Sequence, residues 1–125
     1  MLLTCANHDE LNFAHSKVQF IVVGAGEQQP QFVSQAQKVD GLLKVIPPPS
    51  SDDLLRQLYV ASDVLLLPSI NEGISLVVYD TMMVNGAVPI VTDVGDQSEV
   101  VVHNVTGMLI PDSRNASEVL SLIHI

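Results

Sequence analysis

The chain has 125 residues, of which 47% are hydrophobic and 4% are aromatic, and its formal net charge at pH 7 is −9. This length fits at most one domain, with a core built mainly from Val, Leu and Ile. Nucleic-acid binding requires clustered positive charge, whereas the few basic residues here are scattered along the chain. We therefore expect no nucleic-acid partner. The basic residues are Lys17, Lys38, Lys44, Arg56 and Arg114.

The sequence carries no signal for a membrane span, a leader or a metal. No apolar run reaches the ~18 residues of a membrane span, and the first residues lack the basic lead and long apolar stretch of a signal peptide. A single cysteine, Cys5, cannot form an internal disulfide, which fits a reducing compartment. These features predict a cytoplasmic location without a membrane span. The four histidines show no paired spacing, so we expect no metal site.

The first third of the chain predicts a helix end, a strand and a helix. Residues 1–14 place apolar side chains loosely at helical spacing, and we interpret part of this segment as the end of a helix. Residues 18–23 are β-branched and apolar on both faces, which is typical of a central parallel strand. The glycines of residues 24–26 end it. Residues 28–39 then predict a polar surface helix with one apolar face (Phe32, Val33, Ala36 and Val39).

The next segment predicts a strand followed by a capped helix. Residues 42–46 form the strand, and the three prolines at 47–49 stop it because proline cannot donate to a sheet ladder. Ser50 or Ser51 is expected to cap the helix, which has two acids in its first turn. Its predicted buried stripe consists of Leu54, Leu55, Leu58 and Tyr59.

The remaining elements continue the alternation of strand and helix. Residues 64–67 predict a buried strand, and residues 76–84 predict a buried helix that ends near Asn85 and Gly86. Residues 88–92 and 108–110 predict two further strands. A last helix is expected to begin at Asn115.

This order predicts an α/β fold, a Rossmann-like parallel sheet with helices on both faces. The strands at 64–67 and 88–92 should be parallel, because the intervening helix makes a crossover. Ligands in such sheets bind beyond the carboxyl ends of the strands. The loops in that position are residues 24–28, 47–51, 68–73 and 93–98, which are rich in Gly, Pro, Ser or acids.

The strongest candidate site is the stretch from the loop at 68–73 into the helix that follows. The first N–H groups of a helix have no partner within it and favour an anion. Glu72 precedes this helix and Asp80 lies within it. Carboxylates hold phosphate poorly but accept hydrogen bonds from sugar hydroxyls. The combination indicates a ligand with both phosphate and sugar, bound in one cleft with the loop of Gly24 and Gly26.

The same stretch carries a family resemblance. Residues 67–76 (LPSINEGISL), residues 82–91 (MMVNGAVPIV), Gly95 and residues 98–101 (SEVV) resemble the retaining GT-B glycosyltransferases of group 1, which are related to sucrose synthase and to bacterial glycan glycosyltransferases. The resemblance covers roughly residues 18–119 and is specific around residues 62–110. It implies that residues 1–119 are part of the C-terminal, nucleotide-sugar-binding domain of a GT-B fold, without its first βα unit.

The resemblance also implies roles for individual residues. Glu72 would contact the hydroxyls of the donor sugar, and Asp80 would bond the ribose, although the family has the longer Glu at that position. The N–H groups of Gly73, Ile74 and Ser75 would bind the diphosphate, while Ser75 has the alternative role of a helix cap. Gly24 and Gly26 would border the base, or form only a tight turn. Asp96 stands where the family often has a second glycine.

The implied function is transfer of a sugar from a nucleotide sugar to an acceptor with retention, without a metal or other cofactor. The family supplies a catalytic His and the acceptor site from an N-terminal domain, and an Arg and a Lys from the first βα unit. We find neither region here, so we expect this chain to be inactive alone. The missing first strand would also leave residues 18–23 with an unpaired edge. A Rossmann-like nucleotide-binding or interaction module without catalysis is the alternative, and an epimerase of the same fold fits less well.

Residues 120–125 (LSLIHI) resemble the translation of a transposon-derived sequencing adapter. We therefore leave them out of the functional interpretation.

Overall fold

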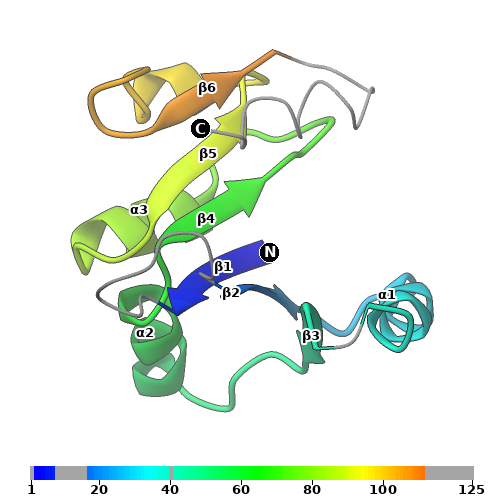
Figure 1. Ribbon diagram of the computed structural model, residues 1–125. Coiled ribbons are helices and arrows are strands. Elements are labelled where there is room, and N and C mark those ends of the chain that lie inside the picture. The colour runs from blue at the N-terminus through cyan, green and yellow to red at the C-terminus, as the bar shows by residue number, and fades with distance from the viewer. Residues whose placement is uncertain (1, 8–16, 40, 112–125) are drawn as a thin grey trace.

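The computed structural model describes residues 2–7, 17–39 and 41–111. Within these residues six strands form one sheet in the order β3-β2-β1-β4-β5-β6 (Figure 1). The strands are β1 (Leu2–Asn7), β2 (Lys17–Val23), β3 (Leu43–Ile46), β4 (Val64–Leu67), β5 (Val88–Thr92) and β6 (Met108–Ile110). The helices are α1 (Gln29–Ala36), α2 (Asp52–Val60), α3 (Leu76–Met83) and the short 3₁₀ helix η2 (Gln97–Glu99).

Five of the six strands take part in parallel pairs, as the sequence predicts. β2 pairs with β3, β4 with β5 and β5 with β6, all in parallel. The register of β4 and β5 places Val64 opposite Val88 and Leu67 opposite Val91. The α3 helix is therefore a crossover between parallel strands, and the Rossmann-like α/β fold is confirmed.

The segment at the start of the chain is a strand, so the expected helix end is wrong for residues 2–7. β1 lies in the middle of the sheet and runs antiparallel to both β2 and β4. The predicted unpaired edge of β2 is also wrong, because β2 pairs with β1 on one side and β3 on the other. The direction of β1 has a simple cause. Residues 8–16 connect it to β2, and a parallel crossover needs a dozen or more residues.

The helices lie on both sides of the sheet. α2 and α3 lie next to each other on one side, whereas α1 packs beside β3 on the other (Figure 1). The side chain of Ser51 caps α2 by accepting a hydrogen bond from the N–H of Leu54 at 3.4 Å. Leu54 does not belong to the buried stripe that the sequence predicts, because its side chain is 47% exposed. Tyr59 is the buried residue of this helix.

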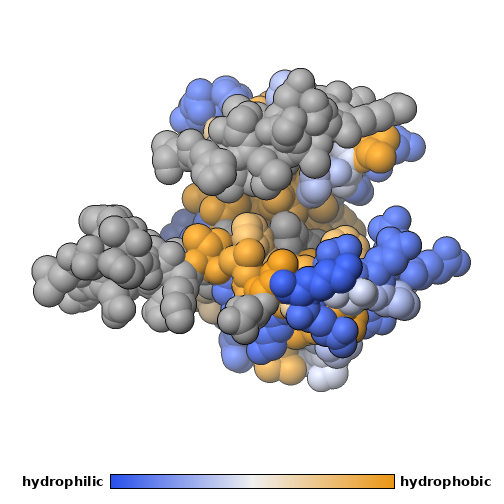
Figure 2. Space-filling model, turned by 45° about the vertical axis from the view of Figure 1, so that its right-hand side comes forward, coloured by the Kyte–Doolittle hydropathy of each residue, from blue (hydrophilic) through white to orange (hydrophobic). Residues whose placement is uncertain are grey.

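Alternation along β4 and β5 divides the core between the two faces of the sheet. Leu65 and Val91 pack with Tyr59 of α2 and Val78 of α3. Leu66 and Ile90 point the other way and pack with Ile110 of β6. Figure 2 shows hydrophobic residues across the middle of one side of the molecule, with hydrophilic residues beside them. β2 contributes no fully buried side chain from residue 18 onward, which fits a sheet covered incompletely by helices.

Two expectations fall outside the described residues. They are the helix from Asn115 and the foreign origin of residues 120–125. In the part of the chain that is described, no helix combines the length and the apolar character needed to cross a membrane.

Candidate functional site

The loop between β4 and α3 holds Glu72 in a defined position. The carboxylate oxygen Oε2 of Glu72 accepts a hydrogen bond from the hydroxyl of Ser69 at 3.0 Å. Both side chains are half-buried, and both residues follow the carboxyl end of β4. The sequence predicts Glu72 at this edge of the sheet, but its bond with Ser69 was not anticipated.

The N-terminus of α3 follows directly after Glu72. The helix begins at Leu76, with Ser75 as its N-cap residue. The N–H groups of Gly73, Ile74 and Ser75 have no hydrogen-bond acceptor among the described residues. The Ser75 side chain is buried and makes no capping bond, so its predicted alternative role as a side-chain cap is not observed. These N–H groups remain available to an anionic group.

The turn after β5 packs against the Glu72 loop. The hydroxyl of Thr92 donates a hydrogen bond to the carbonyl oxygen of Ser69. Gly95 has a φ of +58°, and a Cβ added to it would overlap the carbonyl oxygen of Glu72. The two loops predicted at the ligand-binding edge therefore touch each other. Asp96, next to Gly95 in the chain, is exposed.

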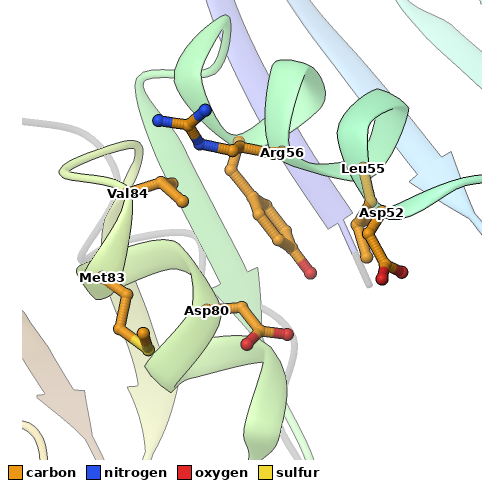
Figure 3. Close-up of a pocket in the computed structure, with 7 residues that line it drawn as sticks. Asp52, Leu55, Arg56, Asp80, Met83 and Val84 are labelled. Carbon is orange, nitrogen blue, oxygen red and sulfur yellow. The ribbon is translucent and has the colours of Figure 1, made fainter.

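Asp80 lines a cavity between α2 and α3 with a volume of about 340 Å³. Figure 3 shows the carboxylates of Asp52 and Asp80 on facing helices, with Arg56 on the same helix as Asp52. Burial is the larger cause, and the negative charge of Asp80 the smaller one, of a raised pKa at Tyr59, which also lines the cavity. Tyr59 therefore keeps its proton more firmly than a free phenol does. Two carboxylates and a phenol suit a ligand rich in hydroxyl groups.

The glycines after β2 line a different cavity. Gly24 and Gly26 border a space of about 170 Å³ between β2, β3 and α1. Neither this cavity nor that of Asp80 is lined by Glu72, and the two share no lining residue. Asp80 and the two glycines, which are predicted to open into one cleft, thus line separate cavities here. Side chains of α1, including Phe32, occupy the region beside the Gly24 loop.

Several residues of the site were missed by sequence reasoning. Arg56, Asp52 and Tyr59 lie on α2 and line the cavity of Asp80 from a helix, whereas the predicted site residues lie in loops and on α3. The spacing of Asp52 and Arg56, four residues apart, places both on one helix face and was the available signal. Thr92 gave no signal, because its partner is far away in the sequence.

Within residues 2–7, 17–39 and 41–111, no three His, Cys, Asp or Glu side chains gather in a way that could hold a metal ion. A family model described as glycosyl transferases group 1 matches residues 4–124. A search of curated proteins found no match. The family match covers nearly the whole sequence, including the Glu72 loop, α3 and the turn after β5. The chain belongs to the group 1 glycosyl transferases, a family whose domain indicates sugar transfer.

Proposed function

We propose that this chain binds the nucleotide-sugar donor of a retaining glycosyltransferase with the GT-B fold. The observation that carries the proposal is the Glu72 carboxylate, held by Ser69 at the carboxyl end of β4 and directly before the N-terminus of α3. A fixed carboxylate beside free helix N–H groups offers acceptors for sugar hydroxyls and donors for phosphate oxygens. Membership of the glycosyl transferases group 1 supports the interpretation of this arrangement as a site for a sugar donor.

Each part of the donor has a proposed partner. The hydroxyls of the sugar donate to Glu72, and the diphosphate accepts from the N–H groups of Gly73, Ile74 and Ser75. The ribose donates to Asp80, and Gly24 and Gly26 border the base. Asp is shorter than the family's Glu by one carbon–carbon length of about 1.5 Å. The cavity beside Asp80 supports a ribose that lies against the α2–α3 groove.

Arg56 supplies a positive charge near the proposed site of a negatively charged donor. A donor diphosphate carries about two negative charges, and enzymes stabilise the departing diphosphate with Arg, Lys or a metal. In the proposed enzyme this cation comes from residues of the first βα unit, and no metal takes part. Arg56 shares the cavity of Asp80 and adds positive charge on the ribose side. The acceptor and the catalytic His belong to a separate N-terminal domain, so transfer requires both domains.

The test is substitution of Glu72 in the full-length enzyme. We expect Glu72→Ala to lower the transfer rate by a factor of roughly ten to a thousand, because a charged hydrogen bond to the sugar is lost. Asp53→Asn is the control, since it removes one exposed acid of α2 that does not line the cavity of Asp80. Transfer from UDP-, GDP- and ADP-sugars is measured for both variants. Near-normal transfer by Glu72→Ala would remove Glu72 from the donor site.

Calorimetric titration separates this function from that of a binding module without catalysis. A donor-binding domain should bind one of these nucleotide sugars more tightly than the free nucleotide, because Glu72 contacts the sugar. Equal affinity for the sugar nucleotide and the nucleotide, without transfer by the full-length protein, would favour the binding module.

A further inference from the structure

We infer that Thr92, at the end of β5, and Gly95, in the turn that follows, are positioning residues that set the location of Glu72. The inference rests on the proposed function, in which Glu72 contacts the donor sugar. It adds that the sugar contact is defined by a neighbouring strand rather than by the loop that carries Glu72. In this proposal neither Thr92 nor Gly95 touches the donor, and both act through Glu72.

The first link is a hydrogen-bond relay from β5 to the carboxylate. Thr92 is 4% exposed, and its hydroxyl donates to the carbonyl oxygen of Ser69. The hydroxyl of the same Ser69 donates to Glu72 at 3.0 Å. Ser69 is thus held through its backbone and holds Glu72 through its side chain. A shift of the Ser69 backbone moves the donor atom on which the Glu72 carboxylate depends.

The second link is a direct contact between backbones. A Cβ added to Gly95 would overlap the carbonyl oxygen of Glu72 and would lie 3.4 Å from the Cα of Gly73. The positive φ of Gly95 is a second reason for glycine, but Asn also adopts that conformation. Asn is nevertheless excluded, because its Cβ would overlap the carbonyl oxygen of Glu72. Gly95 therefore fixes the peptide between Glu72 and Gly73, which carries one of the proposed phosphate-binding N–H groups.

Together the two links fix both ends of the loop segment that carries the carboxylate. Thr92 holds Ser69 before Glu72, and Gly95 rests against the peptide after it. A hydrogen bond tolerates only a few tenths of an ångström in length, and small displacements in a catalytic site reduce rates strongly. The half-buried Glu72 carboxylate thus lies in a loop segment with a contact on each side.

The chain offers matched controls for both residues. Thr92 and Thr81 are both buried, and the hydroxyl of each donates to a backbone carbonyl. The bond of Thr81 stays within α3, ending on Val77, whereas the bond of Thr92 reaches the Glu72 loop. Gly107 resembles Gly95 because an added Cβ would also meet a carbonyl oxygen, but that oxygen belongs to Pro89 in β5.

The first measurement uses the amide chemical shifts of the isotope-labelled chain without ligand. Thr92→Val and Gly95→Ala should shift the amides of Glu72 and Gly73, whereas Thr81→Val and Gly107→Ala should leave them in place. Thr92→Ser keeps the hydroxyl and should restore the original shifts. Unmoved Glu72 and Gly73 amides in both Thr92→Val and Gly95→Ala would overturn the inference.

The second measurement uses transfer by the full-length enzyme. Thr92→Val should lower kcat/KM about twofold to tenfold, which corresponds to one neutral hydrogen bond. Gly95→Ala should lower it roughly a hundredfold, as expected for misplacement of a catalytic group by about 1 Å. Thr81→Val should change it by less than about twofold. Displaced amides with unchanged transfer would overturn the proposed role of Glu72, while the link between the two loops would stand.

Discussion

At the scale of single residues, Asp80 and Tyr59 show how the site depends on neighbours in space. Asp80 is exposed on α3, but its carboxylate faces a cavity whose other wall is α2. Tyr59 is 2% exposed and belongs to the main core cluster. A buried phenol next to a negative charge resists ionisation, because the charged form is desolvated and repelled. The raised pKa of Tyr59 therefore reports on the packing of α2 against α3.

This raised pKa predicts a loss of stability in alkaline solution. Above about pH 10 the unfolded chain releases the Tyr59 proton, whereas the folded chain retains it until its higher pKa is reached. The unfolded state then binds fewer protons, so the free energy of unfolding falls with pH by up to about 1.4 kcal/mol per pH unit. Tyr59→Phe lacks this titration and should lose less stability as the pH rises.

Urea unfolding across this pH range checks the prediction. Tyr79→Phe is the control, because Tyr79 is 41% exposed and lies on the outer side of α3. It should keep the steep pH dependence of the original chain. If the free energy of unfolding falls as steeply with pH in Tyr59→Phe as in Tyr79→Phe, Tyr59 is not the group responsible.

At the scale of elements, α3 combines a buried face with an apolar exposed one. The sequence predicts a buried helix over residues 76–84. In the structure Val78 is buried, but Leu76 is 75% exposed and Met83 is 82% exposed. Only the face toward β4, β5 and α2 is covered, so this part of the prediction is wrong. Apolar composition shows which side chains of a helix favour burial, but the elements that pack against the helix determine which of them are buried.

The end of α3 follows the sequence prediction closely. Asn85 has a φ of 50°, its N–H donates to Met82, and the N–H of Gly86 donates to Thr81. This pair of bonds is a Schellman motif, which ends helices with a left-handed residue. A Cβ added to Gly86 would lie 2.7 Å from the carbonyl oxygen of Tyr59. The same oxygen accepts from the N–H of Ala87, so this motif also joins α3 to α2.

The motif predicts opposite effects for two substitutions of Asn85. Asn85→Ala should lower the free energy of unfolding by about 1 kcal/mol, because a Cβ without a polar group disfavours the left-handed conformation. Asn85→Gly should leave it unchanged or raise it slightly, since glycine adopts this conformation readily. Urea unfolding of the two variants gives the comparison. Equal stability of the Ala and Gly variants would contradict the assigned backbone conformation.

At the scale of the whole molecule, β1 joins two groups of strands. β2 and β3 lie on one side of it, and β4, β5 and β6 lie on the other. β2 and β4 do not pair with each other, so the hydrogen-bonded sheet is continuous only through β1 (Figure 1). The antiparallel direction of β1 makes this a mixed sheet, in which the other described pairings outside β1 are parallel.

A proline in β1 tests this arrangement. Thr4 pairs with Phe20 of β2 and Val64 of β4, so Thr4→Pro would remove a hydrogen bond in the interior of the sheet. We expect a loss on the order of 3 kcal/mol in the free energy of unfolding. Thr4→Val retains the N–H and should change stability little.

Comparable unfolding midpoints for Thr4→Pro and Thr4→Val would exclude β1 from the centre of the sheet, because proline cannot donate a hydrogen bond to a neighbouring strand.

The sequence by itself determined the local structure from β2 onward and the location of the candidate loop. Apolar β-branched runs, prolines and capping residues act on neighbouring residues, and they placed β2 to β6, α1 to α3 and the Glu72 loop correctly. Family membership also follows from local motifs, which the family match confirms.

Only the tertiary structure decided the contacts between distant residues. The direction of β1, the exposure of Leu54, the cavity that Arg56 and Asp80 share across two helices and the contact of Gly95 with Glu72 have no local signature. They arise because the strands of a sheet must pair and the side chains of a core must pack closely. These requirements involve the whole chain at once, whereas periodicity and capping involve only a few adjacent residues.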